Sequence, residues 1–237
     1  MMLRNRIELD CQNCSIREGS VFGGLCAHSI SAINGHKSTN IHRKGQILFH
    51  EGTRPLGVYC VNKGKIKLYK LGNEGKEQII QLAKEGELLG YRSMISEELY
   101  PVSAETLEEC HVCFVPKQDF LQMLSNNHEL YAKLFKHACH ELGLMTQNVT
   151  NLAQKTVRER LAITFIMLRE TYGKDHNEDN KTVINLTRED LANIVGTATE
   201  TLIRLLHDFK EDDVISTKGR KIIIENESEL IRIANLS

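Results

Sequence analysis

Cysteine is the residue type in this chain best suited to binding a metal. The sequence holds seven cysteines, and two pairs are separated by two residues, Cys11 with Cys14 and Cys110 with Cys113. An odd number of cysteines in a reducing compartment argues against a disulfide scaffold and leaves thiols, metal ligands or packing residues. Two such pairs together form the donor set of a zinc site. If Cys110 and Cys113 lie in one strand, however, a spacing of three places them on opposite faces, which argues against zinc.

A second stretch, residues 186–210, has the pattern of two short helices joined by a tight turn. Thr187 is placed to cap the first helix, and Gly196 suits the turn because glycine tolerates a positive φ. The second helix is expected to begin at Thr197 or Thr199. The second helix turns its apolar residues inward, namely Leu202, Leu205, Leu206 and Phe209. The pattern is typical of a DNA-reading helix-turn-helix, with an ordinary helical hairpin as the alternative.

The composition is that of a globular protein of 237 residues, with 41% hydrophobic and 26% charged residues, enough for two domains or one large one. It has no apolar run long enough to span a membrane and no signal-peptide core, so we expect a cytoplasmic protein without membrane contact. The net charge of −1 gives no general nucleic-acid signature, so a DNA-binding surface must be local. The sequence contains no G-x-S-x-G, P-loop or H-E-x-x-H motif, and we do not expect an enzyme.

From Ile41 to Cys113 the pattern changes to short strands separated by glycine-containing turns. We expect strands at residues 42–49, 57–61, 65–71, 77–82, 102–106 and 111–115. Strands spaced about ten residues apart indicate an antiparallel jelly roll or barrel. Cys60, in one of these strands, and Cys139 further along the chain are expected to be buried packing residues.

From residue 117 the periodicity is helical, with a short helix over residues 117–126 and a long one over about 128–154. Apolar residues recur along the long helix at alternating spacings of three and four, which is a heptad seam. The seam residues are Phe135, Ala138, Leu142, Met145, Val149 and Leu152. A seam of this length needs a partner, and the simplest is a second copy of the chain. Packing against the strand domain of a monomer is the alternative.

The C-terminal part has the pattern of a winged helix. An amphipathic helix over residues 156–172 and a polar loop at 173–181 precede the helix-turn-helix, and residues 214–217 and 221–224 are expected to pair around the basic turn Lys218-Gly219-Arg220. The expected fold class is α+β. We expect a cysteine-containing segment (1–30), a β-roll sensor domain (31–117), a dimerisation helix region (118–154) and a DNA-binding domain (155–237).

A roll, a long helix and a C-terminal winged helix together resemble the Crp/Fnr family of bacterial transcription regulators. The most specific match is Gly196 to Leu206, GTATETLIRLL, which has the family's E-x-x-x-R pattern in a G-x-x-x-E-T frame. The resemblance covers nearly the whole chain. It implies a cyclic-nucleotide-binding-like jelly roll that senses a signal. It also implies a homodimer that binds a double-stranded DNA operator and works with RNA polymerase.

Within this resemblance, Glu200 and Arg204 are expected to read bases. An arginine can donate two hydrogen bonds to guanine and a glutamate can accept one from cytosine, whereas the alternative is a surface ion pair. Ile203 stands where family members that read the Fnr-type site have serine, and Thr199 stands where Crp-type readers have arginine. The resemblance therefore does not determine the outer bases of the half-site. Further DNA contacts are expected from Arg188, Thr197, Thr199, Lys218, Arg220 and Lys221.

The resemblance offers two signals for the roll. One branch binds cyclic AMP through a glutamate and an arginine, but Tyr91 and Val102 stand at those positions, so cyclic AMP is not expected. The other branch holds a [4Fe–4S] cluster on four cysteines, which here would be Cys11, Cys14, Cys26 and Cys113. Cys26 lies later than the family pattern places its third cysteine. Zinc and unligated thiols are the alternatives.

These observations predict a homodimeric, sequence-specific transcription regulator of the Crp/Fnr type, controlled by a signal sensed in the roll. The alternative function is a cyclic-nucleotide- or metal-binding sensor whose winged helix mediates protein contacts. Glu200 and Arg204 discriminate between the two, because only the first function requires them to contact DNA.

Overall fold

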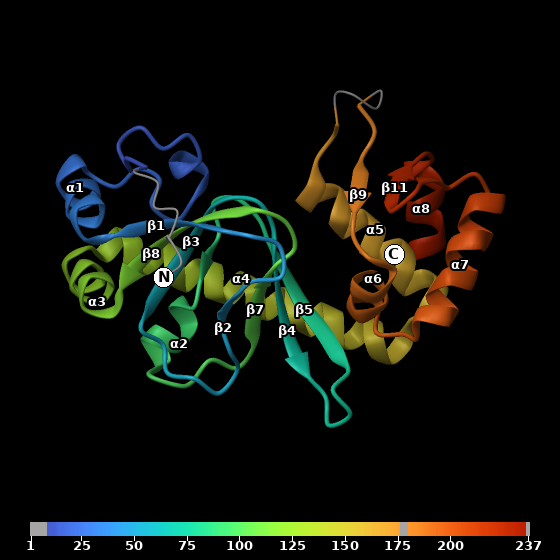
Figure 1. Cartoon of the computed structure of the whole chain (residues 1–237), viewed down its shortest axis with the longest axis horizontal. Helices are drawn as coiled ribbons and strands as arrows, with labels where there is room; N and C mark the ends of the chain where they lie inside the picture. The colour runs from blue at the N-terminus through green and yellow to red at the C-terminus, as the bar shows by residue number, and fades with distance from the viewer. Residues whose placement is uncertain (1–8, 176–179, 236–237) are drawn as a thin grey trace. The chain divides into compact units, whose positions relative to one another are not determined.

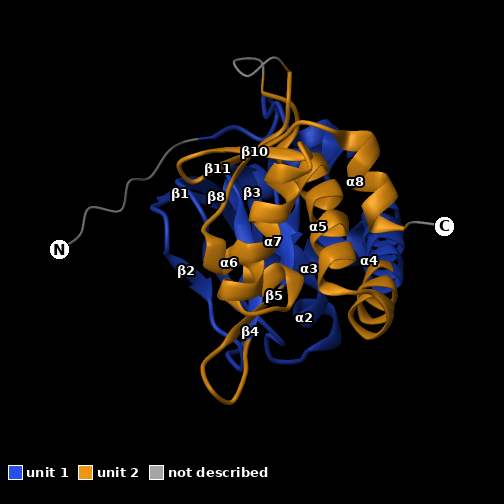
Figure 2. Ribbon diagram, turned by 90° about the vertical axis from the view of Figure 1, so that its right-hand side faces the viewer, with its two compact units in different colours: residues 1–70, 80–143 blue, residues 71–79, 144–237 orange. Residues whose placement is uncertain are grey.

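The computed structural model describes residues 9–175 and 180–235 of the chain (Figure 1). Residues 176–179, part of the predicted polar loop, lie outside the described residues. The chain forms two compact units, residues 1–70 with 80–143 and residues 71–79 with 144–237 (Figure 2). No helix among the described residues is long and apolar enough to cross a membrane.

Two four-stranded sheets form the predicted roll. The first has the order β1-β8-β3-β6 and consists of β1 (Ser38–His42), β3 (Gly57–Lys63), β6 (Leu88–Leu89) and β8 (Cys110–Pro116). The second has the order β2-β7-β4-β5 and consists of β2 (Ile47–Phe49), β4 (Ile66–Leu71), β5 (Glu77–Ala83) and β7 (Ser103–Thr106). The pairs β1 with β8, β3 with β8 and β4 with β7 are antiparallel, so the antiparallel roll is confirmed.

Strands β3 and β8 present their side chains alternately to two hydrophobic cores, because successive residues of a strand point to opposite faces. Val61 and Val112 lie in the core within the roll, together with Phe49 and Tyr100, whose stacked rings have centroids 3.9 Å apart. Val58 and Val115 belong to the second core, which helices cover. The outer faces of these two strands are therefore buried as well, which keeps their short side chains at fixed positions.

The helices of the first unit are α1 (Ala27–His36), α2 (Tyr91–Ser96), α3 (Lys117–Asn126) and the first part of α4 (His128–Gln154), with a 3-10 turn, η1, at Arg17–Gly19. Helices α1 and α3 lie side by side (Figure 1). Helices α3 and α4 have the predicted bounds, whereas α1, α2 and the short strand β6 were not expected.

The continuous strand predicted at residues 42–49 is wrong. Strand β1 ends at His42 and β2 begins at Ile47. Between them the backbone N–H of Gln46 donates to the carbonyl of Arg43 at 3.2 Å, and Gly45 has a φ of +78°. This left-handed glycine closes a turn, so the segment cannot continue as one strand.

The second unit contains the predicted winged helix. Its helices are α5 (Val157–Tyr172), α6 (Arg188–Val195), α7 (Thr199–Glu211) and α8 (Glu227–Ala234), and its three-stranded sheet has the order β10-β11-β9. The strands are β9 (Val183–Asn185), β10 (Ile215–Lys218) and β11 (Lys221–Ile224). Phe165 of α5 and Phe209 of α7 are fully buried with ring centroids 5.9 Å apart, so α7 rests on a packed core.

Candidate DNA-binding surface and cysteine cavity

The turn between α6 and α7 is set by two residues that the sequence predicted. Oγ1 of Thr187 accepts a hydrogen bond from the backbone N–H of Asp190 at 2.9 Å, so Thr187 caps α6. Gly196 follows α6 with a φ of +72°, a left-handed conformation that favours glycine at a helix C-terminus. Helix α7 then begins at Thr199. The predicted cap and turn are both confirmed.

Arg160 of α5 holds the same turn from outside the helix-turn-helix, and the sequence pattern does not reveal it. Its guanidinium donates to the carbonyl oxygens of Val195 at 3.0 Å and of Gly196 at 3.2 Å. A cation at a helix C-terminus satisfies carbonyls that have no partner within the helix. Only the packing of α5 against α6 brings this side chain to the turn, so chain spacing gives no signal for it.

The first half of α7 presents three predicted base-reading residues on one exposed face. Glu200, Ile203 and Arg204 are all exposed and follow one another at spacings of three and one, which on a helix places them side by side. The opposite face carries Leu202, Leu206 and Phe209, which are buried. Leu205 was expected inside but is only half-buried. The buried face fixes the helix, and the exposed face stays available for contact.

The hairpin β10–β11 ends in the predicted basic turn and is tied to the start of α6. Lys218, Arg220 and Lys221 are exposed at its tip. The guanidinium of Arg188 donates to the carbonyl oxygen of Arg220 at 3.2 Å and contacts that of Gly219 at 3.5 Å. Burial, followed by the nearby positive charge of Arg220, lowers the pKa of Arg188. Thr197 and Thr199 are half-buried at the turn.

Four cysteines from three parts of the first unit line one cavity. Cys11 and Cys14 belong to the N-terminal segment, Cys60 to β3 and Cys113 to β8. Burial, followed by the neighbouring Cys113, Cys14 and Cys11, raises the pKa of the Cys60 thiol far above its usual value. Burial also raises the pKa of Cys113. The sequence predicted three of these residues as metal ligands and Cys60 only as a packing residue.

The other cysteines lie outside this cavity. Cys26, predicted as a ligand, is the exposed residue before α1, with its Sγ 3.3 Å from Oγ of Ser29. Cys110 is buried in the core inside the roll, on the face of β8 opposite Cys113, so the alternative zinc site cannot include it. Cys139 is exposed on α4, so the prediction that it is a buried packing residue is wrong.

A buried carboxylate on α4, Glu141, connects the long helix to the start of α2. The hydroxyl of Tyr91 donates to Oε2 of Glu141 at 2.7 Å, and Nε of Arg92 lies 3.6 Å from the same oxygen. Nε2 of Gln81 donates to Oε1 at 3.3 Å, and His137, one turn earlier on α4, lies 3.7 Å away. The carboxylate is thus surrounded by donors contributed by three elements.

The predicted seam along α4 is uncovered in the single chain. Phe135, Leu142 and Val149 are 64%, 66% and 66% exposed, and Leu152 is also exposed. Ala138 and Met145 are half-buried. Large apolar side chains repeated on one helix face are uncommon on a free surface, so this face fits an interface with a partner.

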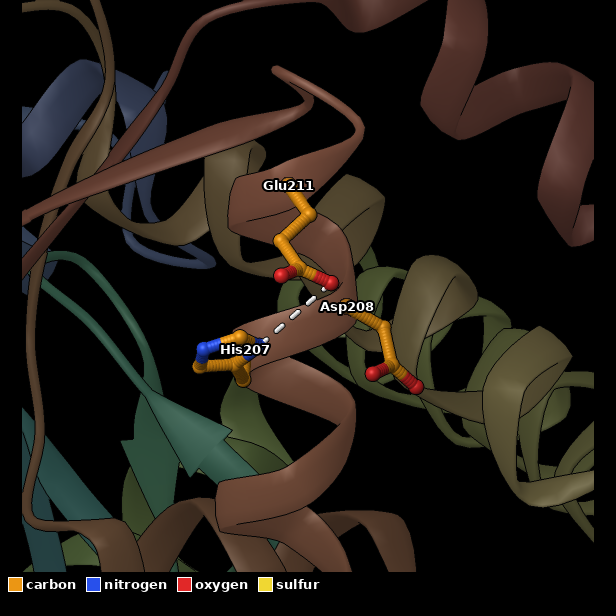
Figure 3. Close-up of side chains that lie close together, drawn as sticks. All are labelled: His207, Asp208 and Glu211. Atoms are coloured by element: carbon orange, nitrogen blue, oxygen red, sulfur yellow. Dashed lines mark ion pairs between the residues drawn. The ribbon is translucent and has the colours of Figure 1, made fainter.

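Figure 3 shows a separate group on α7, in which His207 and Glu211 form an ion pair. Nδ1 of His207 lies 3.5 Å from a carboxylate oxygen of Glu211, and with Asp208 they are the one group in the described part of the chain with three ligating atoms within 4.8 Å of one another. His207 and Glu211 are 68% exposed and one helical turn apart. The geometry is that of a solvated helix-surface pair.

Comparisons with known proteins agree with this architecture. Residues 41–127 match the cyclic nucleotide-binding domain family, and residues 159–233 match the Crp-like helix-turn-helix domain family. The chain is 29% identical over 227 residues to the fumarate and nitrate reduction regulatory protein of Yersinia pestis, covering 95% of this chain and 90% of that protein. It is 27% identical over 233 residues to the transcriptional activator protein Anr of Pseudomonas protegens, covering 98% and 95%.

Solved structures share the fold at lower identity. The structure of FixK2 from Bradyrhizobium japonicum superposes with a TM-score of 0.76 and 21% identity, covering 85% of this chain and 98% of that chain. A transcriptional regulator of the CRP/FNR family from Thermus thermophilus, TTHA1359, superposes with a TM-score of 0.72 and 21% identity, covering 84% and 98%. These similarities establish the arrangement of a roll, a long helix and a winged helix.

Proposed function

The chain belongs to the Crp/Fnr family of transcription regulators, and from this premise we propose that it acts as a homodimer whose two α7 helices read two DNA half-sites. Its relatives are transcription regulators and not enzymes. The chain is a DNA-binding transcription regulator. The proposal adds that it forms a dimer, and it specifies the residues that contact DNA and the group that is sensed.

The exposed face of α7 carries the proposal. Glu200, Ile203 and Arg204 stand near the N-terminal end of a helix whose other face is anchored in the core. In a helix-turn-helix this end of the second helix enters the major groove. There Arg204 can donate two hydrogen bonds to guanine O6 and N7, Glu200 can accept from cytosine N4, and Ile203 can contact a thymine methyl.

The remaining predicted contacts surround this face and suit the phosphate backbone. Arg188, Lys218, Arg220 and Lys221 supply positive charge at the wing, and the hydroxyls of Thr197 and Thr199 are neutral donors at the turn. Contacts of this kind position the protein on DNA without reading its sequence. RNA polymerase is the further partner expected of a regulator of this type.

The test compares two arginine substitutions in sequence selection from randomised DNA. Arg204→Ala is expected to weaken binding to the preferred site by ~1–3 kcal/mol and to relax the preference at one base pair. The control is Arg232→Ala on α8, an exposed arginine paired with Glu229 and outside the predicted contact set. Unchanged sequence preference in Arg204→Ala would overturn the proposed role of α7.

For the sensed group we propose a metal centre held by cysteines of the first unit, with an iron–sulfur cluster as its occupant. Thiolates are the ligands such clusters require. Three of the four predicted ligands, Cys11, Cys14 and Cys113, line one cavity, whereas Cys26 does not. The donor set around this cavity is rich in thiols, so it fits the group.

Cyclic AMP is disfavoured as the signal. Val102, where the resemblance places the phosphate-binding arginine, is a buried apolar residue. Tyr91, where it places a glutamate, is buried and donates its hydroxyl hydrogen to Glu141. A cyclic phosphate at this position would lose its bidentate guanidinium partner.

A further inference from the structure

The ligand set of the proposed metal centre can be assigned from the strands that flank the cavity. We propose that Cys60 completes a four-thiolate site with Cys11, Cys14 and Cys113, and that Cys26 is not a ligand. The assignment rests on the proposed cysteine-held centre and specifies which residues hold it. It replaces Cys26, which the family resemblance implied, by Cys60, which strand register places beside Cys113.

Strand register places Cys60 beside Cys113. The two residues are direct partners in the antiparallel pair β3–β8, and such partners have their Cβ atoms about 4.5–5.5 Å apart on the same face. That face is the one carrying Val58 and Val115, because residues two apart in a strand point the same way. Two thiols on neighbouring central strands therefore form one half of the donor set.

The N-terminal segment supplies the other half and is held in place by hydrogen bonds. The backbone N–H of Cys11 donates to Oδ1 of Asn34 at 3.0 Å, and the guanidinium of Arg17 donates to the carbonyl of Cys11 at 3.3 Å. The backbone N–H of Arg17 donates to the carbonyl of Cys14 at 3.1 Å. These bonds fix a C-x2-C loop over the two strand cysteines.

Two polar side chains beside the cavity suit bound thiolates. Nδ2 of Asn62, on β3 two residues after Cys60, donates to Sγ of Cys14 at 3.5 Å. Hydrogen bonds to cysteine sulfur are among the contacts that tune metal–thiolate centres. Lys37 also lines the cavity and donates to the carbonyl of Leu9. Its ammonium group places a positive charge where several thiolates would concentrate negative charge.

The arrangement of the sulfurs bears on whether one zinc ion could occupy the site as it stands. Around one zinc ion, with Zn–S bonds of about 2.3 Å in a tetrahedron, the sulfurs would lie about 3.8 Å apart. Among the described cysteines, no three sulfurs lie within 4.8 Å of one another. Four cysteine thiolates are the donor set of an iron–sulfur cluster, which we propose as the occupant, and a zinc ion is the alternative that the metal analysis below tests.

The experiment compares full-length wild-type protein with Cys60→Ser and Cys26→Ser, all purified without oxygen. Iron, acid-labile sulfide and zinc are measured per chain, together with visible absorption. We expect iron and sulfide in the wild type and in Cys26→Ser, and a loss of most of both in Cys60→Ser. Circular dichroism checks that each variant is folded.

A labelling experiment on the wild type keeps the assignment testable if Cys60→Ser does not fold. The native anaerobic protein is alkylated, treated with acid and a chelator, and alkylated again with a second reagent. We expect Cys26 and Cys139 to carry the first label, because both are exposed. Cys11, Cys14, Cys60 and Cys113 are expected to carry the second.

The outcomes separate the ligand assignment from the proposed centre. Iron that is retained by Cys60→Ser but lost by Cys26→Ser would overturn the assignment and leave the centre standing. Zinc without iron or sulfide would overturn the assignment to a cluster. A metal-free wild type, including one with a Cys60–Cys113 disulfide, would overturn the centre itself, while the Arg204 test of DNA reading would stand independently.

Discussion

At the scale of single residues, the DNA contacts that we propose for the winged helix are of two kinds. Arg204 lies on the face of α7 that would meet base edges, whereas Arg220 lies at the tip of the β10–β11 hairpin. Base contacts carry sequence preference, and phosphate contacts carry salt-dependent affinity that is shared by all sequences. A substitution at Arg204 should therefore change sequence preference, whereas a substitution at Arg220 should change the affinity for DNA of any sequence.

Arg220→Ala is expected to weaken binding about equally to preferred and unrelated DNA and to lower the slope of log affinity against log salt by about 1. The substitution leaves the backbone carbonyl that accepts from Arg188 in place. Fluorescence anisotropy over a salt series measures both quantities. A loss confined to the preferred sequence would contradict the phosphate role and assign Arg220 to base reading.

Glu87 should make the stability of the first unit depend on pH. Burial, ahead of the neighbouring Glu141 carboxylate, raises the pKa of Glu87 from 4.5 to about 7. Between these values the folded protein holds a proton that the unfolded chain releases, so the free energy of unfolding falls as the pH rises. The glutamine in the Glu87→Gln variant cannot ionise, so the free energy of unfolding of the variant should not fall with pH for this reason.

Thermal denaturation of the wild type and of Glu87→Gln at about pH 5 and about pH 8 tests this expectation. The melting temperature of the wild type, relative to the variant, should be lower at the higher pH by a few degrees. A difference in melting temperature that does not change with pH would show that Glu87 ionises in the folded protein as it does in the unfolded chain.

At the scale of elements, the uncovered seam of α4 is the surface that we propose as the dimer interface. Val149 stands on the seam and Asn148 is its exposed neighbour on another face of the same helix. Val149→Glu would bury an unpaired charge in a dimer interface, which costs ~3–5 kcal/mol and corresponds to a hundredfold or greater rise in the dimer Kd. Asn148→Glu is the matched control.

Sedimentation equilibrium measures the association of both variants. We expect Val149→Glu to shift toward monomer while Asn148→Glu remains like the wild type. If the wild type is itself a monomer at micromolar concentration, or if both variants associate equally, the seam is not the dimer interface.

Helices, caps and turns that depend on residues close in the sequence could be predicted. Contacts between residues that are far apart in the sequence could not. The caps and turn at Thr187 and Gly196 depend on neighbours within a few residues, and helix α4 follows its own periodicity. Helix α2 has six residues, too few for a periodic pattern. The pairing of Cys60 with Cys113 joins positions far apart in the chain, and Arg160 reaches the turn only through packing.

At the scale of the whole molecule, the proposed metal site and the candidate DNA-binding surface lie in different units. The cysteine cavity and the Glu141 contacts belong to the first unit, and the DNA-binding surface belongs to the second. Helix α4 passes from one unit to the other, and Glu141 places a buried hydrogen-bonded carboxylate on it. In the proposed dimer, we expect a change in the first unit that moves α4 to alter the spacing of the two α7 helices.

The most direct test of this account is the DNA sequence that the anaerobically purified wild-type protein selects from a randomised library. Two α7 helices in a symmetric dimer should select an inverted repeat whose half-sites are centred about one helical turn apart, roughly 34–36 Å. The repeat should carry guanine at the position that Arg204 contacts, and this guanine should lose its enrichment in Arg204→Ala. Selection of a single unpaired half-site, or of no sequence at all, would contradict a dimeric, sequence-reading regulator.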